Sequence, residues 1–267
     1  MKRRSSLYVP GDNERMVAKS WKINADALIF DLEDSVRPEN KNLARSVISK
    51  TLKNSENSSK EIQVRINPVI SKEFKRDMKF VKGLQEKVCV VVPKSEYPLP
   101  EELVKSDLQL IPLIETAAGL LHVESLCRYD SVTAVSWGAA DLSLSMGGQV
   151  EQYENNGYVY MALVSADRAY GIDPIDKVYF NLDNLAGFES ECNVSHGLGY
   201  VGKQLIHPSQ VDIANRIFTP SERDIKWARE IIAALESTNR GAIRSQGKLI
   251  DSVHVRIAKR ILESAET

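Results

Sequence analysis

Residues 110–137 read LIPLIETAAGLLHVESLCRYDSVTAVSW, and this stretch contains the pattern that decides the fold. Two short apolar runs, at 110–114 and 132–137, flank a segment at 117–128 that is expected to be helical. Neither run alternates regularly between apolar and polar residues, which is typical of strands that are buried on both faces. The stretch therefore predicts a strand–helix–strand unit of a parallel sheet covered by helices.

The same unit repeats on both sides of this stretch. Six further strands are predicted at 6–9, 27–31, 62–66, 88–92, 177–180 and 202–206. Further helices are predicted at 13–23, where Asp12 is expected to cap the first turn, and at 40–53, 72–84, 158–170, 185–198 and 209–217. Eight alternations in 267 residues predict an α/β protein with an eight-stranded (β/α)8 TIM barrel, and a doubly wound open sheet is the alternative.

The C-terminal part of the chain differs from the repeating unit. Two helices are predicted at 221–237 and 253–263, separated by a polar loop at 238–248. We therefore expect a barrel domain over residues 1–220 and a helical extension over 221–267. An extension beyond the eighth strand is expected to cover the barrel mouth or to pack on a neighbouring subunit.

Composition excludes several classes of protein. Hydrophobic residues make up 43% of the chain and charged residues 27%, which are ordinary values for a soluble globular protein. The net charge is −1, and a nucleic-acid binder needs a basic surplus on one face. No segment predicts a signal peptide or a membrane span, and the three separated cysteines form no CxxC pair. A cytoplasmic protein that binds neither nucleic acid nor membrane is expected.

Charged residues collect where the predicted strands end, which is where barrel enzymes carry their active sites. Glu115 and Asp141 follow two adjacent strands, and two carboxylates with open positions between them suit Mg²⁺. The alternative is that each carboxylate caps a helix or forms a salt bridge. No His/Cys cluster has the spacing of a zinc site, so a hard, oxygen-preferring metal is the only kind indicated.

Arg65 follows an apolar run and is a candidate for pairing with a substrate carboxylate. An internal ion pair with Asp31, Glu33 or Asp34 is the alternative, and both can hold if the acidic residues orient the guanidinium. A lone histidine at a strand end, such as His207 before Pro208, is more often structural than catalytic. Lys19 has the pattern of a solvated surface charge.

Seven ordered motifs resemble the citrate lyase β-subunit family, which includes citryl-CoA, malyl-CoA and citramalyl-CoA lyases. They are RRSSLYVPG, LIFDLEDSV, VRIN, LIPLIET, SWGAADLS, GKQLIHPSQ and GKLID, and the resemblance runs from Arg4 to about Leu262. The resemblance implies a barrel fold, trimeric or hexameric assembly, and action on an acyl-CoA thioester.

The resemblance also implies roles for matching residues. Glu115 and Asp141 would ligate Mg²⁺, and Arg65 would bind the carboxylate of the keto acid. The other implied roles are substrate binding for Tyr8, Val9, Lys19, Ala140, Asp141, His207 and Pro208, support of the site for Glu33 and Asp34, and proton transfer for Asp251. The family's C-terminal segment, which carries Asp251 here, closes over a neighbouring subunit's site.

The implied reaction is carbon–carbon bond cleavage of a carboxylated 3-hydroxyacyl-CoA into acyl-CoA and a keto acid, as in citryl-CoA lyase. Residues 151–165, EQYENNGYVYMALVS, depart from the helix start common in the family, which leaves the acyl substrate open. Three alternatives therefore stand: a malyl-CoA or citramalyl-CoA lyase, a thioesterase or malate-synthase-like enzyme, and a non-catalytic CoA-binding subunit.

Overall fold

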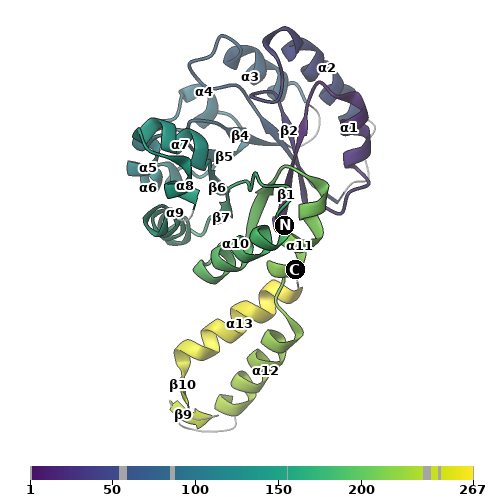
Figure 1. Cartoon of the computed structure of the whole chain (residues 1–267). Helices are drawn as coiled ribbons and strands as arrows, with labels where there is room; N and C mark the ends of the chain where they lie inside the picture. Colours follow the sequence, from purple (N-terminus) through teal and green to yellow (C-terminus); the bar gives the residue numbers. More distant parts are fainter. Residues whose placement is uncertain are drawn as a thin grey trace. The chain divides into compact units, whose positions relative to one another are not determined.

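The strands of the repeating unit close into a parallel barrel in the computed structural model of the chain, which describes residues 2–53, 59–84, 88–154, 156–236, 242–245 and 248–266. The strands follow sequence order around the barrel, and β8 pairs with β1. Figure 1 shows the barrel with most of its strands labelled. Their bounds are β1 Ser5–Pro10, β2 Ala27–Asp31, β3 Glu61–Arg65, β4 Cys89–Val92, β5 Gln109–Ile114, β6 Ala134–Trp137, β7 Asp173–Asp176 and β8 Gly202–Leu205. Closure confirms the predicted barrel and rejects the open sheet.

Helices surround the barrel on its outer side (Figure 1). Every residue of β2, β4 and β6 is buried, as expected for strands that are covered on both faces. The helices of this part are α1 Glu14–Ser20, α2 Lys41–Leu52, α3 Phe74–Lys82, α4 Glu101–Val104, α5 Ala117–Leu121, α6 Val123–Cys127, α7 Ala139–Met146, α8 Val150–Glu154, α9 Gly157–Ala169, α10 Leu185–Leu198 and α11 Val211–Ile217, with 3-10 turns η1 Pro38–Asn40 and η2 Pro208–Gln210.

The barrel interior is filled by alternate residues of the strands. One cluster of buried side chains comprises Ile29, Cys89, Val91, Ile111, Leu113, Ala134 and Ile175, with Tyr8 packed against it. Because side chains alternate across a strand, Asp31 shares the face of Ile29. Asp31 lies opposite Arg65 in the register of β2 and β3, so both end their strands at the same edge of the barrel.

Several predicted elements differ from the structure. The seventh strand is predicted at 177–180, but in the structure it is Asp173–Asp176. This segment contains Pro174 and two aspartates and therefore lacks the apolar signal of a buried strand. The expected helix 117–128 is divided at His122, whose backbone leaves the helical region. Asn13 rather than Asp12 caps α1, because the Asn13 side chain accepts from the Met16 N–H while Asp12 accepts from Asn40.

The chain divides into two compact units, residues 3–215 and a second unit that begins at Arg216 and also includes Lys2. The second unit contains α12 Glu222–Glu236 and α13 Ser252–Glu266, and its core includes the buried residues Ala228, Ile231, Ile250 and Ala258. The predicted loop at 238–248 includes strand β9 Ala242–Ser245, which pairs antiparallel with β10 Lys248–Asp251. Residues 238–241 and 246–247 of that loop lie outside the described residues. In the described parts of both units, helices are too short or too polar to cross a bilayer.

Candidate active site

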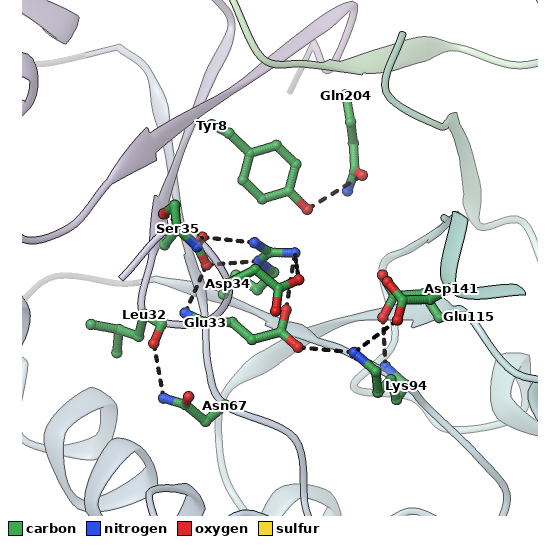
Figure 2. Close-up of polar contacts among 12 residues, drawn as sticks. Tyr8, Leu32, Glu33, Asp34, Ser35, Asn67, Lys94, Glu115, Asp141 and Gln204 are labelled. Atoms are coloured by element: carbon green, nitrogen blue, oxygen red, sulfur yellow. Dashed lines mark hydrogen bonds and ion pairs between the residues drawn. The ribbon is translucent and has the colours of Figure 1, made fainter. Parts of the chain in front are cut away.

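Arg65, the last residue of β3, pairs with three carboxylates: Asp31, the last residue of β2, and two that follow it. These two, Glu33 and Asp34, are labelled in Figure 2. The Arg65 Nε and one terminal nitrogen each donate to an oxygen of Asp31 at 2.7 Å, which is the bidentate geometry of a strong ion pair. Its other terminal nitrogen lies 3.0 Å from Glu33 and 3.7 Å from Asp34. The guanidinium also lies 4.7 Å from the centre of the Tyr8 ring. The internal ion pair predicted for Arg65 is therefore present.

Asp31 is fixed by the turn that follows β2. Its carboxylate accepts from the backbone N–H of Glu33 at 2.9 Å and from the Ser35 hydroxyl at 2.6 Å. Burial alone would raise the pKa of Asp31, but pairing with Arg65 outweighs burial and lowers it. The buried Lys41 ammonium donates to the backbone carbonyls of Leu32 and Glu33 at 2.6 and 2.7 Å, which fixes the same turn from behind.

Glu115 and Asp141 lie on one side of the site, at the ends of β5 and β6 (Figure 2). Glu115 is 5% exposed, and its Oε2 accepts from the backbone N–H of Lys94 at 3.0 Å. Its Oε1 faces Gly138, where an added Cβ would lie only 2.8 Å away. Asp141, in the first turn of α7, directs Oδ1 toward the Lys94 ammonium at 3.3 Å. Burial and the charge of Glu33 raise the pKa of Glu115 to about 8.

Lys94 connects the two groups of carboxylates, a role that sequence reasoning did not assign to it. Its ammonium lies 3.2 Å from Glu33 and 3.3 Å from Asp141, and Figure 2 shows it between them. Burial disfavours its charge, but the charges of Glu33, Glu115 and Asp141 outweigh burial and raise the pKa of Lys94. Its place directly after Pro93 at a strand end was the only signal in the sequence.

Carboxyl groups outnumber cationic side chains in this cluster. Burial raises the pKa of Glu33 despite the neighbouring Arg65. Glu33 Oε2 lies 3.0 Å from the Arg65 guanidinium but accepts no well-aligned hydrogen bond from any described residue. Arg65 and Lys94 thus face five carboxyl groups, and a bound cation would favour the ionised form of those whose pKa is raised. The members of the cluster are Arg65, Lys94, Asp31, Glu33, Asp34, Glu115 and Asp141.

A pocket of about 330 Å³ opens onto the cluster. Tyr8 and Gln204 lie on its wall, and the Tyr8 hydroxyl donates to Gln204 Oε1 at 3.3 Å. Gln204 had no predicted role, because its place in β8 gives no chemical signal until strand pairing brings it beside β1. The remaining lining residues are Pro10, Met16, Asp31, Asp34, Ser35, Arg65, Leu113, Glu115, Trp137, Gly138, Ala139, Ala140, Asp141, Val178, Phe180 and Ile206.

Four of the predicted substrate-binding residues do not line this pocket. Val9 is 3% exposed and alternates with the pocket residue Tyr8 along β1, while Lys19 is exposed on α1. His207 caps η2, where its Nδ1 accepts from the Ser209 N–H, and Pro208 is the first residue of that turn. His207 therefore has the structural role that is usual for a lone histidine, and any contact of these four with an acyl-CoA stays a prediction.

Asp251 belongs to the C-terminal unit, where it precedes α13. Its Oδ1 accepts from the Val253 N–H at 3.0 Å and lies 2.8 Å from Nδ1 of His254. Hydrogen bonding with His254 lowers the pKa of Asp251, so the carboxyl is ionised at neutral pH in this setting. Its catalytic role stays a prediction.

Comparison with known proteins connects this geometry to a family. The sequence profile described as HpcH/HpaI aldolase/citrate lyase matches residues 4–208. A (3S)-malyl-CoA thioesterase of Cereibacter sphaeroides is 32% identical, with 98% of this chain and 94% of the relative covered. Human mitochondrial citramalyl-CoA lyase is 32% identical, with 93% and 81% covered.

A solved structure agrees over the same extent. The protein CitE from Mycobacterium tuberculosis, in complex with magnesium, acetoacetate and coenzyme A, is 26% identical, with a TM-score of 0.84 and 98% of both chains covered. The family profile matches well over half of the sequence, and the matched residues include Arg65 at the end of β3 and Glu115 directly after β5. The chain therefore belongs to the HpcH/HpaI aldolase/citrate lyase family.

Proposed function

We propose that this protein is a magnesium-dependent carbon–carbon lyase that cleaves a carboxylated 3-hydroxyacyl-CoA into an acyl-CoA and a keto acid. One observation carries the proposal: the Glu115 and Asp141 carboxylates share a pocket with an arginine that Asp31 holds in fixed orientation. The lyase activities named for the human citramalyl-CoA lyase and for the L-malyl-CoA/beta-methylmalyl-CoA lyase of Rhodobacter capsulatus support it.

The residues present fit a magnesium ion. Glu115 Oε1 and Asp141 Oδ2 accept no hydrogen bond from any described residue, so each carboxylate has an oxygen free for a metal. Mg²⁺ typically takes one or two carboxylates and completes its shell with water and substrate oxygens. In the described parts of the chain, no group of three or more His, Cys, Asp or Glu side chains is placed to hold a metal alone. A site with two protein ligands leaves positions for the substrate.

The protein's own residues would orient the substrate. Arg65 has N–H groups that Asp31 does not use, although one terminal nitrogen also lies 3.0 Å from Glu33, and these groups suit the carboxylate that becomes part of the keto acid. A bound Mg²⁺ supplies Lewis acidity to the oxygens of the hydroxyl and carboxylate. The hydroxyl would give its proton to a water molecule, the C2–C3 bond would break, and the electron pair of that bond would pass to the thioester as an enolate. Protonation at C2 then gives the acyl-CoA.

Asp251 is the proposed proton donor to C2, delivered from the C-terminal unit of a neighbouring subunit in a trimer or hexamer. Beside His254 the Asp251 carboxyl is ionised, so it has no proton to donate. Burial in the assembled site would have to raise the pKa of Asp251 before it could act as the donor. A cytoplasmic location is part of the same proposal.

A thioesterase is the second candidate function, and the malyl-CoA thioesterase names of the Cereibacter sphaeroides relatives favour it. In that reaction water attacks the thioester carbonyl and releases free CoA. A thiol reagent detects free CoA, whereas lyase cleavage leaves CoA esterified.

The deciding experiment measures keto-acid release from citryl-, malyl- and citramalyl-CoA with a coupled dehydrogenase. Magnesium-dependent release without free thiol, lost in Glu115→Ala and retained in the surface control Glu101→Ala, would establish the lyase. Release of free thiol alone would establish the thioesterase. Tight CoA binding without turnover of any of the three thioesters would leave a non-catalytic CoA-binding subunit.

A further inference from the structure

Lys94 has a backbone conformation that few residues adopt. Its φ is +49°, and it is the only non-glycine residue with positive φ in the described parts of the chain. The left-handed region disfavours residues with a Cβ, and lysine has no short polar side chain to compensate as asparagine does. A strained residue of this kind beside a pocket indicates a functional constraint.

This conformation lets one residue contact three carboxylates. The backbone N–H donates to Glu115, while the ammonium lies 3.2 Å from Glu33 and 3.3 Å from Asp141. Arg65, the other cation of the cluster, is engaged by Asp31 through two hydrogen bonds. Lys94 is therefore the cation closest to the two proposed metal ligands.

The chemistry of a lysine suits a temporary partner. Its ammonium is a compact charge on a flexible stem, whereas a guanidinium forms rigid bidentate pairs. The Lys94 side chain is about one-third exposed, which leaves it room to move toward solvent. An ammonium close to a divalent cation repels it, and this repulsion is strong where the effective dielectric constant is low.

We propose that the Lys94 ammonium is a resident counter-ion of the divalent-cation site, which holds Glu33 and Asp141 together before the metal binds and opposes the metal when it binds. The inference rests on the magnesium site of the proposed function. On this inference Lys94 is a positioning residue: it orders the pocket when no metal is bound, and it lowers the affinity of the site for magnesium. A lysine that merely supported Glu115 and Asp141 would have the opposite effect, because its removal would weaken metal binding.

The test is calorimetric titration of MgCl₂ into metal-free protein. Lys94→Met removes the charge and keeps an unbranched side chain, and its Kd for Mg²⁺ should fall at least about tenfold. Lys94→Arg keeps the charge and can pair more rigidly with the carboxylates, so its Kd should not fall below the wild-type value. Lys105→Met removes an exposed lysine that pairs with the exposed Glu101, and it serves as the matched control.

Thermal melts give a second measurement that does not depend on turnover. In EDTA, Lys94→Met should melt below the wild type, and Mg²⁺ should raise its melting temperature by more than it raises that of the wild type. Equal or weaker magnesium binding by folded Lys94→Met would overturn the inference while leaving the lyase intact. A wild-type protein that binds no Mg²⁺ would overturn both, and one that binds Mg²⁺ without turnover would overturn the lyase alone.

Discussion

At the scale of single residues, the site is governed by how charge is paired. Arg65 meets Asp31 through two parallel hydrogen bonds, and its planar group also lies over the Tyr8 ring. These contacts fix the plane of the guanidinium before any ligand arrives. Pre-orientation matters for catalysis because a small misplacement of a substrate-binding group costs rate even when the charge is retained.

The first prediction concerns this geometry. Arg65→Lys keeps a positive charge but loses the paired hydrogen bonds to Asp31, so kcat/KM for the thioester should fall about 100-fold or more. Steady-state kinetics of keto-acid release measure the change. Arg76→Lys, at an arginine that is 62% exposed and pairs with Glu73, should leave the kinetics unchanged. Near wild-type kcat/KM in Arg65→Lys would show that charge alone suffices.

A second prediction concerns Asp167, a buried carboxyl in α9. Its Oδ1 accepts from the Cys127 thiol, and its Oδ2 has no hydrogen-bond partner among the described residues. Burial raises the pKa of Asp167 from 3.8 to about 8. Between these values the unfolded chain ionises while the folded chain keeps the proton. This group's contribution to stability is therefore complete below pH 3.8 and is lost as pH rises toward 8, by up to about 1.4 kcal/mol per pH unit.

Asp167→Asn removes that ionisation and should be more stable than the wild type at pH 7, by about 1 kcal/mol or more in urea unfolding. The difference should shrink as pH falls toward 4. Glu61→Gln provides the opposite case, because hydrogen bonds from Arg3 overcome burial and lower the pKa of Glu61. Removing that carboxylate should destabilise the protein at pH 7. An Asp167→Asn variant less stable than wild type at pH 7 would mean that the carboxylate is ionised and paired in the folded state.

Sequence reasoning predicted several residues that the structure brings together in the candidate site. Arg65, Glu115 and Asp141 were predicted because charged residues at the ends of apolar strands are costly unless they serve a site. The ion-pair partner of Arg65 was left open among Asp31, Glu33 and Asp34, because residue type alone does not give the strand register that sets Asp31 opposite Arg65. Lys94 was missed because its role depends on a backbone angle, which residue type alone does not reveal.

At the scale of elements, the junction between β6 and α7 determines the space available to Glu115. Gly138 has an extended backbone that any residue can adopt, so its lack of a side chain is a matter of space. An added Cβ would lie 2.8 Å from Oε1 and 3.1 Å from Cγ of Glu115. The glycine in SWGAADLS is therefore required by the carboxylate beside it.

The third prediction follows from this contact. Gly138→Ala should displace the Glu115 carboxylate and raise the Kd for Mg²⁺ about tenfold, a loss of about 1.4 kcal/mol, while the protein stays folded. Calorimetry measures the Kd and circular dichroism the fold. Gly157→Ala is the matched control, because no atom lies within 4 Å of its added Cβ at the start of α9. Unchanged magnesium affinity in Gly138→Ala would show that Glu115 is not a ligand.

Elements with a strong apolar signal were predicted to within one or two residues, as for β2 and β4. The prediction of β7 was wrong because residues 177–180 have the more strand-like composition, while Asp173–Asp176 is a strand only through its pairing with β6 and β8. Helix α7 was missed because its short small-residue sequence follows a glycine-containing loop. Where the local signal is weak, pairing with neighbouring strands determines which residues form the strand.

At the scale of the whole molecule, the barrel and the C-terminal unit carry different parts of the proposed chemistry. The pocket residues all belong to the unit that spans residues 3–215, and Asp251 belongs to the other. The resemblance implies that Asp251 acts on a neighbouring subunit's site. Which copy supplies a residue is a property of the assembly, and no pattern within one chain reveals it.

The final prediction tests this sharing of a site between subunits. Glu115→Ala lacks a proposed metal ligand and Asp251→Asn lacks the proposed proton donor, so each homo-oligomer should be inactive alone. Asparagine retains a side-chain oxygen that can accept from the Val253 N–H, so the start of α13 should be preserved. After co-refolding of equal amounts, a site is complete only where an intact barrel meets an intact neighbouring Asp251. In a ring of heterologous contacts, random mixing makes about one quarter of the sites complete, so roughly a quarter of the wild-type rate should return.

Mixtures that are not unfolded first should stay inactive when subunits do not exchange, which provides the control for simple additivity of residual activities. If Asp251 acts on the barrel of its own chain, no mixed assembly contains a complete site and the rate stays at the background level. An active Asp251→Asn homo-oligomer would instead remove Asp251 from the chemistry and leave it the cap of α13. Because the two variants lie in separate compact units, recovery of activity would show that neighbouring subunits build each site together.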